Sequence, residues 1–233
     1  MWKLMKLEWK KSNMKKYVVK ATVVTVIIFL TILAMSGELE GIETIEDYGK
    51  SMIKAGVDMF ANMAFILCTA VMLASLIISS YKDKTMDLMF SYPIKRQKIL
   101  LSKMLLVWIF NFFALVLCKL IVYGGLVLAS PLAHISAESV LPAGIWTDVS
   151  FYLEVLFNSA IMVSASYAAL LVGMRMKSSK AAIVAACIIM LLTQGNIGSY
   201  TLINNIPFYM GMVVVSAVSA FLCVHGVEIK DVV

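Results

Sequence analysis

Residues 81–104 carry the stretch that decides the fold, which reads YKDKTMDLMFSYPIKRQKILLSKM. Six of its residues are basic and two are acidic, and long apolar runs lie on both sides of it. In a chain that is 61% hydrophobic, such a charged island must lie in water at a face of the membrane. Its basic excess predicts that this face is cytoplasmic, because lysine and arginine are enriched next to membrane spans on that side.

Within this stretch, residues 85–92 are expected to form a short helix with an apolar face. Pro93 ends that helix, because proline lacks an N–H and disfavours the helical conformation of the residue before it. Two interpretations of the apolar face are open: it lies on the lipid surface, or it docks into a partner protein, which we favour. The residues expected to make this contact are Thr85, Met86, Met89, Phe90, Tyr92, Pro93, Ile94, Lys95 and Arg96.

The same stretch resembles the cytoplasmic segment of ABC exporter permeases of the second integral-membrane family. In that family a short coupling helix precedes a turn of proline, isoleucine or valine and a basic residue, and a leucine-leucine-serine/glycine-lysine helix start follows. Here the turn is Pro93-Ile94-Lys95 and the helix start is "LLSK" at residues 100–103. Residues 83–85, Asp-Lys-Thr, keep only part of the glutamate and glycine-threonine that precede the family's helix. The chain's length and its expected six spans also fit the family.

The resemblance implies a bacitracin- or lantibiotic-type permease, the membrane subunit of an ATP-driven exporter of an amphipathic peptide, antibiotic or lipid-like substrate. It implies two protein partners: a cytoplasmic ABC ATPase that holds ATP and magnesium, and a second copy of this permease or a related one. The chain itself has no G-x-x-x-x-G-K-[ST], H-E-x-x-H or G-x-S-x-G motif, so we expect no enzymatic activity, cofactor or metal on it. The alternative is a passive channel or membrane-assembly protein without an ATPase.

The mean hydropathy of +0.91 indicates a single transmembrane domain over residues 1–233. The expected fold is all-α, with six transmembrane helices, an interfacial amphipathic helix over residues 1–16 and the coupling segment 81–98. Of the 20 lysines and arginines, 17 fall on segments predicted to be cytoplasmic, so both termini are expected inside a bacterial cell membrane. The expected spans are residues 17–35, 59–80, 99–129, 149–174, 181–195 and 208–224.

Membrane lipid is the expected partner of the N-terminal segment. Trp2, Met5 and Trp9 fall on one face of a helix, with lysines on the next stripe. The competing interpretation is a cleaved signal peptide. However, the apolar run over residues 17–35 is longer than the ~7–15 residues of such a signal, so we expect an uncleaved first span. Nucleic acid is not an expected partner, because the basic residues cluster beside apolar runs.

Ionisable and amide side chains inside the spans are candidates for the substrate path. Lys119 lies 16 residues beyond Lys103, about 24 Å along a helix, and therefore inside the bilayer. Three roles are open for it: it snorkels outward, it pairs with Glu154, or it contacts substrate. Residues 36–58 are expected to be a solvated outer loop that includes Asp58. The substrate-path candidates are Asn111, Lys119, Glu154 and Asn158.

Small residues at four-residue spacing in the fourth span predict close helix contacts. Ala165, Ala169 and Gly173 form one such stripe. Small side chains let two helices approach closely in lipid, where no hydrophobic effect drives them together. We expect this stripe to pack within the chain rather than at a subunit interface.

Overall fold

The computed structural model describes residues 5, 8–10, 14–39, 46–78, 96–129, 148–194, 196–197, 200–201 and 206–229. In chain order its elements are α2 (Lys15–Leu39), α3 (Glu46–Leu73), the π-helix η1 (Ala74–Ile78), α6 (Arg96–Ala129), α8 (Val149–Arg175), α9 (Ser179–Gln194), the antiparallel strands β1 (Asn196–Ile197) and β2 (Tyr200–Thr201), and α10 (Ile206–Ile229). Apart from this hairpin of two-residue strands, the elements in the described ranges are helical.

Among the described residues, five helices are long and apolar enough to cross a membrane: Lys15–Met35, Lys54–Ile78, Gln97–Ala129, Val149–Arg175 and Pro207–His225. The chain is therefore a helical, multi-pass membrane protein. The helix at the fifth expected span, α9, is apolar but only 16 residues long.

The bounds expected for the outer loop, residues 36–58, are wrong. α2 continues to Leu39, and α3 begins at Glu46. Charged residues interrupt the apolar run here, and this interruption was interpreted as a loop. In the structure, several of these residues lie in the first turns of the long helix α3. The coupling segment up to Lys95, and most of the expected interfacial helix over residues 1–16, lie outside the described residues.

The chain forms two compact units. Unit 1 comprises Met1–Met14, Phe65–Phe112 and Ala160–Val233, and unit 2 comprises Lys15–Ala64 and Phe113–Ser159. The helices α3, α6 and α8 each contribute residues to both units.

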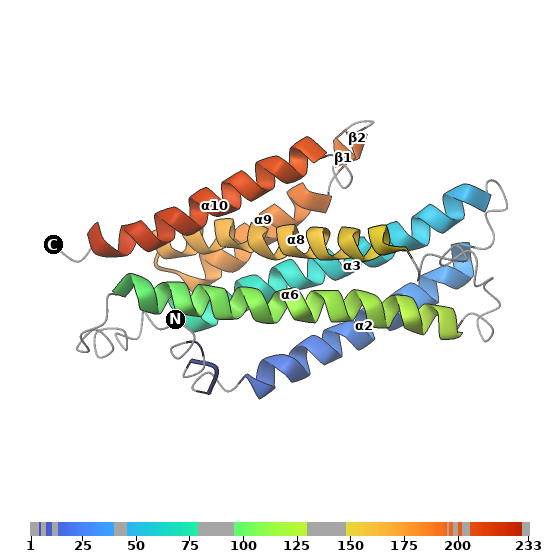
Figure 1. Cartoon of the computed structure of the whole chain (residues 1–233), viewed down its shortest axis with the longest axis horizontal. Helices are drawn as coiled ribbons and strands as arrows, with labels where there is room; N and C mark the ends of the chain where they lie inside the picture. The colour runs from blue at the N-terminus through green and yellow to red at the C-terminus, as the bar shows by residue number, and fades with distance from the viewer. Residues whose placement is uncertain are drawn as a thin grey trace. The chain divides into compact units, whose positions relative to one another are not determined.

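In unit 1, α8 and α9 lie side by side (Figure 1). Ala169 on α8 packs with Ala185 and Ala186 on α9. At Gly173 a Cβ atom would lie 2.5 Å from the Ala182 Cβ and 2.5 Å from the Ile78 Cδ1, so this position has room for hydrogen only. The expected packing of the Ala169–Gly173 stripe within the chain is confirmed.

A tight turn joins α8 to α9. Ser178 N–H donates to the Gly173 carbonyl at 3.1 Å, and Lys177 N–H donates to the Met174 carbonyl at 3.3 Å. Lys177 has a φ of 47°, so these bonds form a Schellman cap with lysine where glycine is commonest. Because this turn reverses the chain within a few residues, α9 runs antiparallel to α8 and lies beside it.

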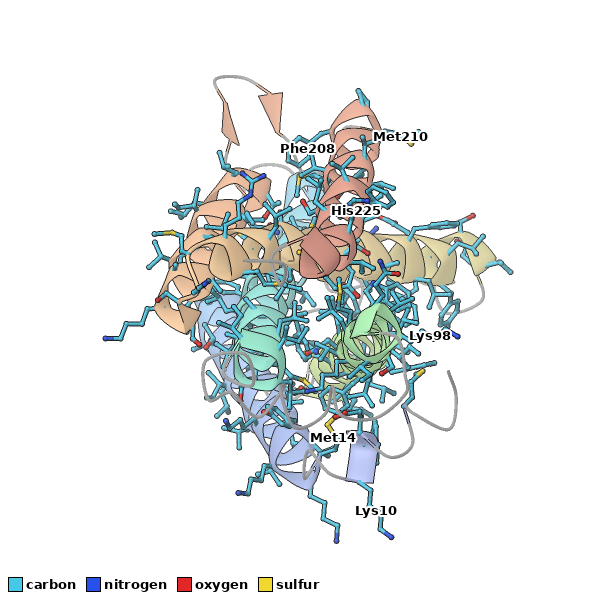
Figure 2. The ribbon with its side chains drawn as sticks, turned by 90° about the vertical axis from the view of Figure 1, so that its left-hand side faces the viewer. Lys10, Met14, Lys98, Phe208, Met210 and His225 are labelled. Carbon is cyan, nitrogen blue, oxygen red and sulfur yellow. The ribbon has the colours of Figure 1, made fainter. Side chains whose placement is uncertain are left out.

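Other faces of unit 1 are apolar and exposed. Met210 and Phe221 on α10 are exposed, and Figure 2 shows Met210 pointing away from the neighbouring ribbons. Near the N-terminus, Trp9 packs edge-on against the Phe110 ring on α6, at 6.1 Å between the ring centroids. Lys10 extends outward (Figure 2). Exposed aliphatic faces on membrane helices are suited to contact with lipid.

In unit 2, α2 and α6 approach closely at Gly125. A Cβ atom there would lie 2.7 Å from Cε2 of the Phe29 ring on α2. The hydroxyls of Thr22, Thr25 and Thr31 each donate to the carbonyl four residues earlier, so α2 carries them without needing water.

Candidate functional site

A buried ion pair lies at the centre of the polar groups of unit 2. Lys119 on α6 is fully buried, and its Nζ lies 2.7 Å from Oδ1 of Asp58 on α3. It also donates to Oδ1 of Asn158 on α8 at 2.9 Å. One ammonium group therefore joins three helices. We call Asp58, Lys119 and Asn158 the lysine cluster.

Helical spacing explains how the sequence builds this cluster. On α3, Lys54, Asp58 and Asn62 recur every four residues, so their side chains share one face. On α6, Lys119 and Tyr123 have the same spacing. The facing stripes bring charges of opposite sign together inside the unit.

A second ion pair lies one turn from the first along α3. Lys54 Nζ is 2.6 Å from Oε2 of Glu154, and their side chains are 31% and 50% exposed. The buried Tyr123 hydroxyl donates to the Lys54 carbonyl at 3.4 Å. Phe151 meets Tyr123 edge-on at 5.5 Å, and its ring centroid is 5.9 Å from Lys54 Nζ. The aromatic pair thus packs against the more exposed ion pair.

The two ion pairs differ in how much the removal of one charge would cost in stability. The more exposed pair can exchange its partners for water or headgroups, so it contributes little to stability. The Lys119–Asp58 pair cannot, and removal of either charge leaves the other uncompensated in a low-dielectric interior. No group of three or more His, Cys, Asp or Glu residues that could hold a metal occurs among the described residues.

Unit 2 holds two further buried polar side chains, near members of the lysine cluster in the sequence. Asn62, one turn after Asp58, and Ser159, next to Asn158, are both fully buried. Within the described part of the chain, neither the Asn62 amide nitrogen and oxygen nor the Ser159 hydroxyl has a hydrogen-bond partner.

The structure corrects the expected surroundings of Lys119. It does not snorkel, since it is fully buried, and the pairing with Glu154 is wrong: Lys119 binds Asp58, and Glu154 binds Lys54. Asp58 is not a solvated loop residue but lies on α3, with its side chain 16% exposed. A negative charge near the start of a span was misread as the end of an outer loop.

Of the four substrate-path candidates, the structure brings Lys119 and Asn158 into contact and places Glu154 in the same unit. Asn111 belongs to unit 1, where its amide nitrogen donates to Met72 Sδ at 3.4 Å and to the Val107 carbonyl at 2.9 Å. The sequence analysis missed Asp58 and Ser159 as members of the site. The four-residue spacing of Lys54, Asp58 and Asn62 puts them on one face of a helix but does not indicate which helix that face meets.

Unit 1 holds a second buried lysine. Lys103 is 5% exposed, and its Nζ donates to the Leu76 carbonyl at 3.2 Å. Leu76 lies in η1, the π-helical turn at the C-terminal end of α3. Lysine favours such ends, because the last carbonyls of a helix carry partial negative charge.

Nearby side chains link the helices of unit 1. The Trp108 indole donates to the Ser164 hydroxyl at 2.9 Å, and the Tyr167 hydroxyl donates to the Met104 carbonyl at 3.2 Å. Ser166 donates to the Ile66 carbonyl at 3.3 Å. These bonds join α3, α6 and α8 within this unit.

The expected ATPase-docking residues Thr85–Lys95 lie outside the described residues. Arg96, the last of them, is the first residue of α6. The structure therefore describes the helix that follows the docking segment, and the docking contact stays a prediction.

The chain is 22% identical over 230 residues to the uncharacterized protein YcbO of Bacillus subtilis (strain 168), a match that covers 98% of this chain and 99% of that protein. No family model matches the chain. No solved structure matches it either. The similarity spans both proteins almost from end to end, and the relative's name states no function.

Proposed function

We propose that this chain is the membrane subunit of an ATP-driven exporter of the ABC type, which docks a cytoplasmic ATPase through residues 85–96. The observation that carries the proposal is the basic, amphipathic segment 81–98 and its resemblance to a coupling helix. The structure supports it in one respect: α6 starts at Arg96, directly after the proline turn, and runs unbroken for 34 residues. A rigid helix of that length transmits a displacement from the docking segment into the bilayer.

The proposed topology has six spans with both termini in the cytoplasm of a bacterial cell. The short helix α9 serves as the fifth span, α10 as the sixth, and residues 1–16 lie in the interface. The basic asymmetry of the sequence supports this orientation. Labelling of a Glu43→Cys protein on a cysteine-free background tests it, and modification only from the cytoplasmic side contradicts it.

In this proposal a second permease subunit, a copy of this chain or a related one, completes the pathway. Six spans enclose little space for a substrate, and homo-oligomers with two-fold symmetry are the commonest arrangement. The lysine cluster then lies where an amphipathic peptide, antibiotic or lipid-like substrate passes through the outer half of the bilayer.

The test is co-purification of the protein with its cognate ATPase from detergent. Phe90→Ala is expected to weaken ATPase binding by roughly 1–3 kcal/mol and to abolish transport, because buried aromatic anchors carry most of the energy of an interface. Lys95→Ala should have a smaller effect, since charges at a rim contribute less.

The matched control is Phe157→Ala, which removes an aromatic ring from an exposed position of α8. It should leave both capture and transport unchanged. Normal capture and transport by a Phe90→Asp protein would mean that the segment rests on lipid. In that case the passive channel or membrane-assembly protein becomes the better description.

A further inference from the structure

Asn62 is a buried amide whose hydrogen-bonding capacity the protein leaves unused. It is 0% exposed, and both its Nδ2 and its Oδ1 lack a partner among the described residues. An amide removed from water without replacement hydrogen bonds is costly, and buried polar groups in proteins are almost always paired. Asn111, by comparison, is equally buried but donates to Met72 and Val107.

Asn62 lies beside the lysine cluster of unit 2. It follows Asp58 by four residues on α3, which puts the two side chains on the same helix face, one turn apart. Ser159 follows Asn158 on α8, is 0% exposed, and also lacks a partner for its hydroxyl within the described residues. The unpartnered groups on two helices thus lie within about one turn of residues that bind the same ammonium group.

The charges of the cluster define what such a site can hold. Lys119 and Asp58 neutralise each other, so the site has no net charge to attract an ion. A cation would meet the Lys119 ammonium, and an anion would meet the Asp58 carboxylate. Asn62 offers donors and an acceptor, and Ser159 offers one donor and two acceptor positions. The complementary ligand is a small neutral molecule that both donates and accepts hydrogen bonds.

We propose that Asn62 and Ser159 bind water beside the Asp58–Lys119 pair, so that unit 2 contains a hydrated polar site within its helices. Buried waters typically make about three hydrogen bonds to otherwise unpaired polar groups, which is what these side chains supply. Water at this position marks a place where a polar group of another molecule can bind instead. The inference does not depend on the exporter proposal.

The direct test is water-edited solid-state NMR of the full-length protein in lipid bilayers, with asparagine side chains labelled with nitrogen-15. Magnetisation should pass from water to the Asn62 amide quickly, and to the Asn111 amide slowly. Asn62 can be assigned without a variant, because Ala61-Asn62 is the only alanine-asparagine pair in the sequence. Transfer to Asn62 as slow as that to Asn111 overturns the proposal.

A double-mutant cycle, measured by thermal unfolding, gives an independent test. Asn62→Leu should lower the apparent melting temperature by about 3–6 °C, because Ser159 loses a hydrogen-bonded water. Asn62→Leu and Ser159→Ala should be non-additive, whereas Asn111→Leu and Ser159→Ala should add. A rise in melting temperature for Asn62→Leu, with additive effects, means that a dry, unpaired amide has been removed, and it overturns the proposal.

Discussion

Each unit of this protein buries one lysine of α6, and the described contacts of the two lysines are of different kinds. Lys103 in unit 1 donates to a backbone carbonyl, that of Leu76 in the π-helical turn η1. Lys119 in unit 2 binds a carboxylate, that of Asp58, and an amide oxygen, that of Asn158.

The difference follows from where each lysine meets its neighbouring helix. The last carbonyls of a helix have no intrahelical partner and carry about half a negative charge, so the backbone there stabilises a lysine ammonium. Asp58 lies in the interior of α3, where the carbonyls are already bonded to the helix's own N–H groups. A fully buried ammonium in that region requires a full counter-charge, and the side chain of Asp58 provides it.

Asp58→Asn should therefore be the most damaging change. It keeps the shape of the side chain but leaves the Lys119 charge uncompensated, at a cost of about 3–5 kcal/mol in the free energy of unfolding. The measurement is the unfolding of the purified protein in mixed detergent micelles. Lys119→Met should restore most of the loss when it is combined with Asp58→Asn, because no buried charge then remains. A double variant as unstable as Asp58→Asn alone contradicts the charge argument.

A second contrast concerns helix packing in unit 1, which relies on small residues rather than charges. Gly173→Ala should destabilise the protein by about 1–3 kcal/mol, because the added Cβ atom overlaps Ala182 and Ile78, and the nearby Ala182 Cα is backbone. The matched control is Gly211→Ala on α10, where nothing lies within 4 Å of the added atom. There, the better helix propensity of alanine should stabilise by up to about 1 kcal/mol. Equal effects at both positions would mean that the α8–α9 contact is looser than in the structure.

Much of this architecture could be predicted from local patterns. Apolar runs located the helices, and the Ala165–Gly173 stripe predicted a close contact, because both signals depend only on neighbouring residues. The partner of Lys119 could not be found in this way. Glu154 was the nearest acid on the next span, but the choice between it and Asp58 depends on how α3 lies against α6, which no local pattern encodes.

Lys103→Met sharpens the comparison of the two lysines. The change removes the buried charge and with it the hydrogen bond to the Leu76 carbonyl. We expect a loss of about 1.5–3 kcal/mol in the same unfolding measurement, the range for a hydrogen bond from a charged group. Lys119→Met alone should cost more, since it leaves Asp58 charged and unpaired. Equal losses for the two methionine variants would remove the distinction between a helix end and a helix interior.

The smallest effect is expected at the Lys54–Glu154 pair. Glu154→Gln keeps the side chain's length and removes its charge, and the partly exposed Lys54 ammonium can then be solvated at the end of the span. The Tyr123 hydroxyl bonds to the Lys54 backbone carbonyl rather than to its side chain, so that link is retained. We therefore expect a change of about 0–1 kcal/mol in the free energy of unfolding. The same variant discriminates between the two possible partners of Lys119. A loss as large as that of Asp58→Asn, reversed by Lys119→Met, would mean that Glu154 neutralises the buried lysine and that Asp58 does not.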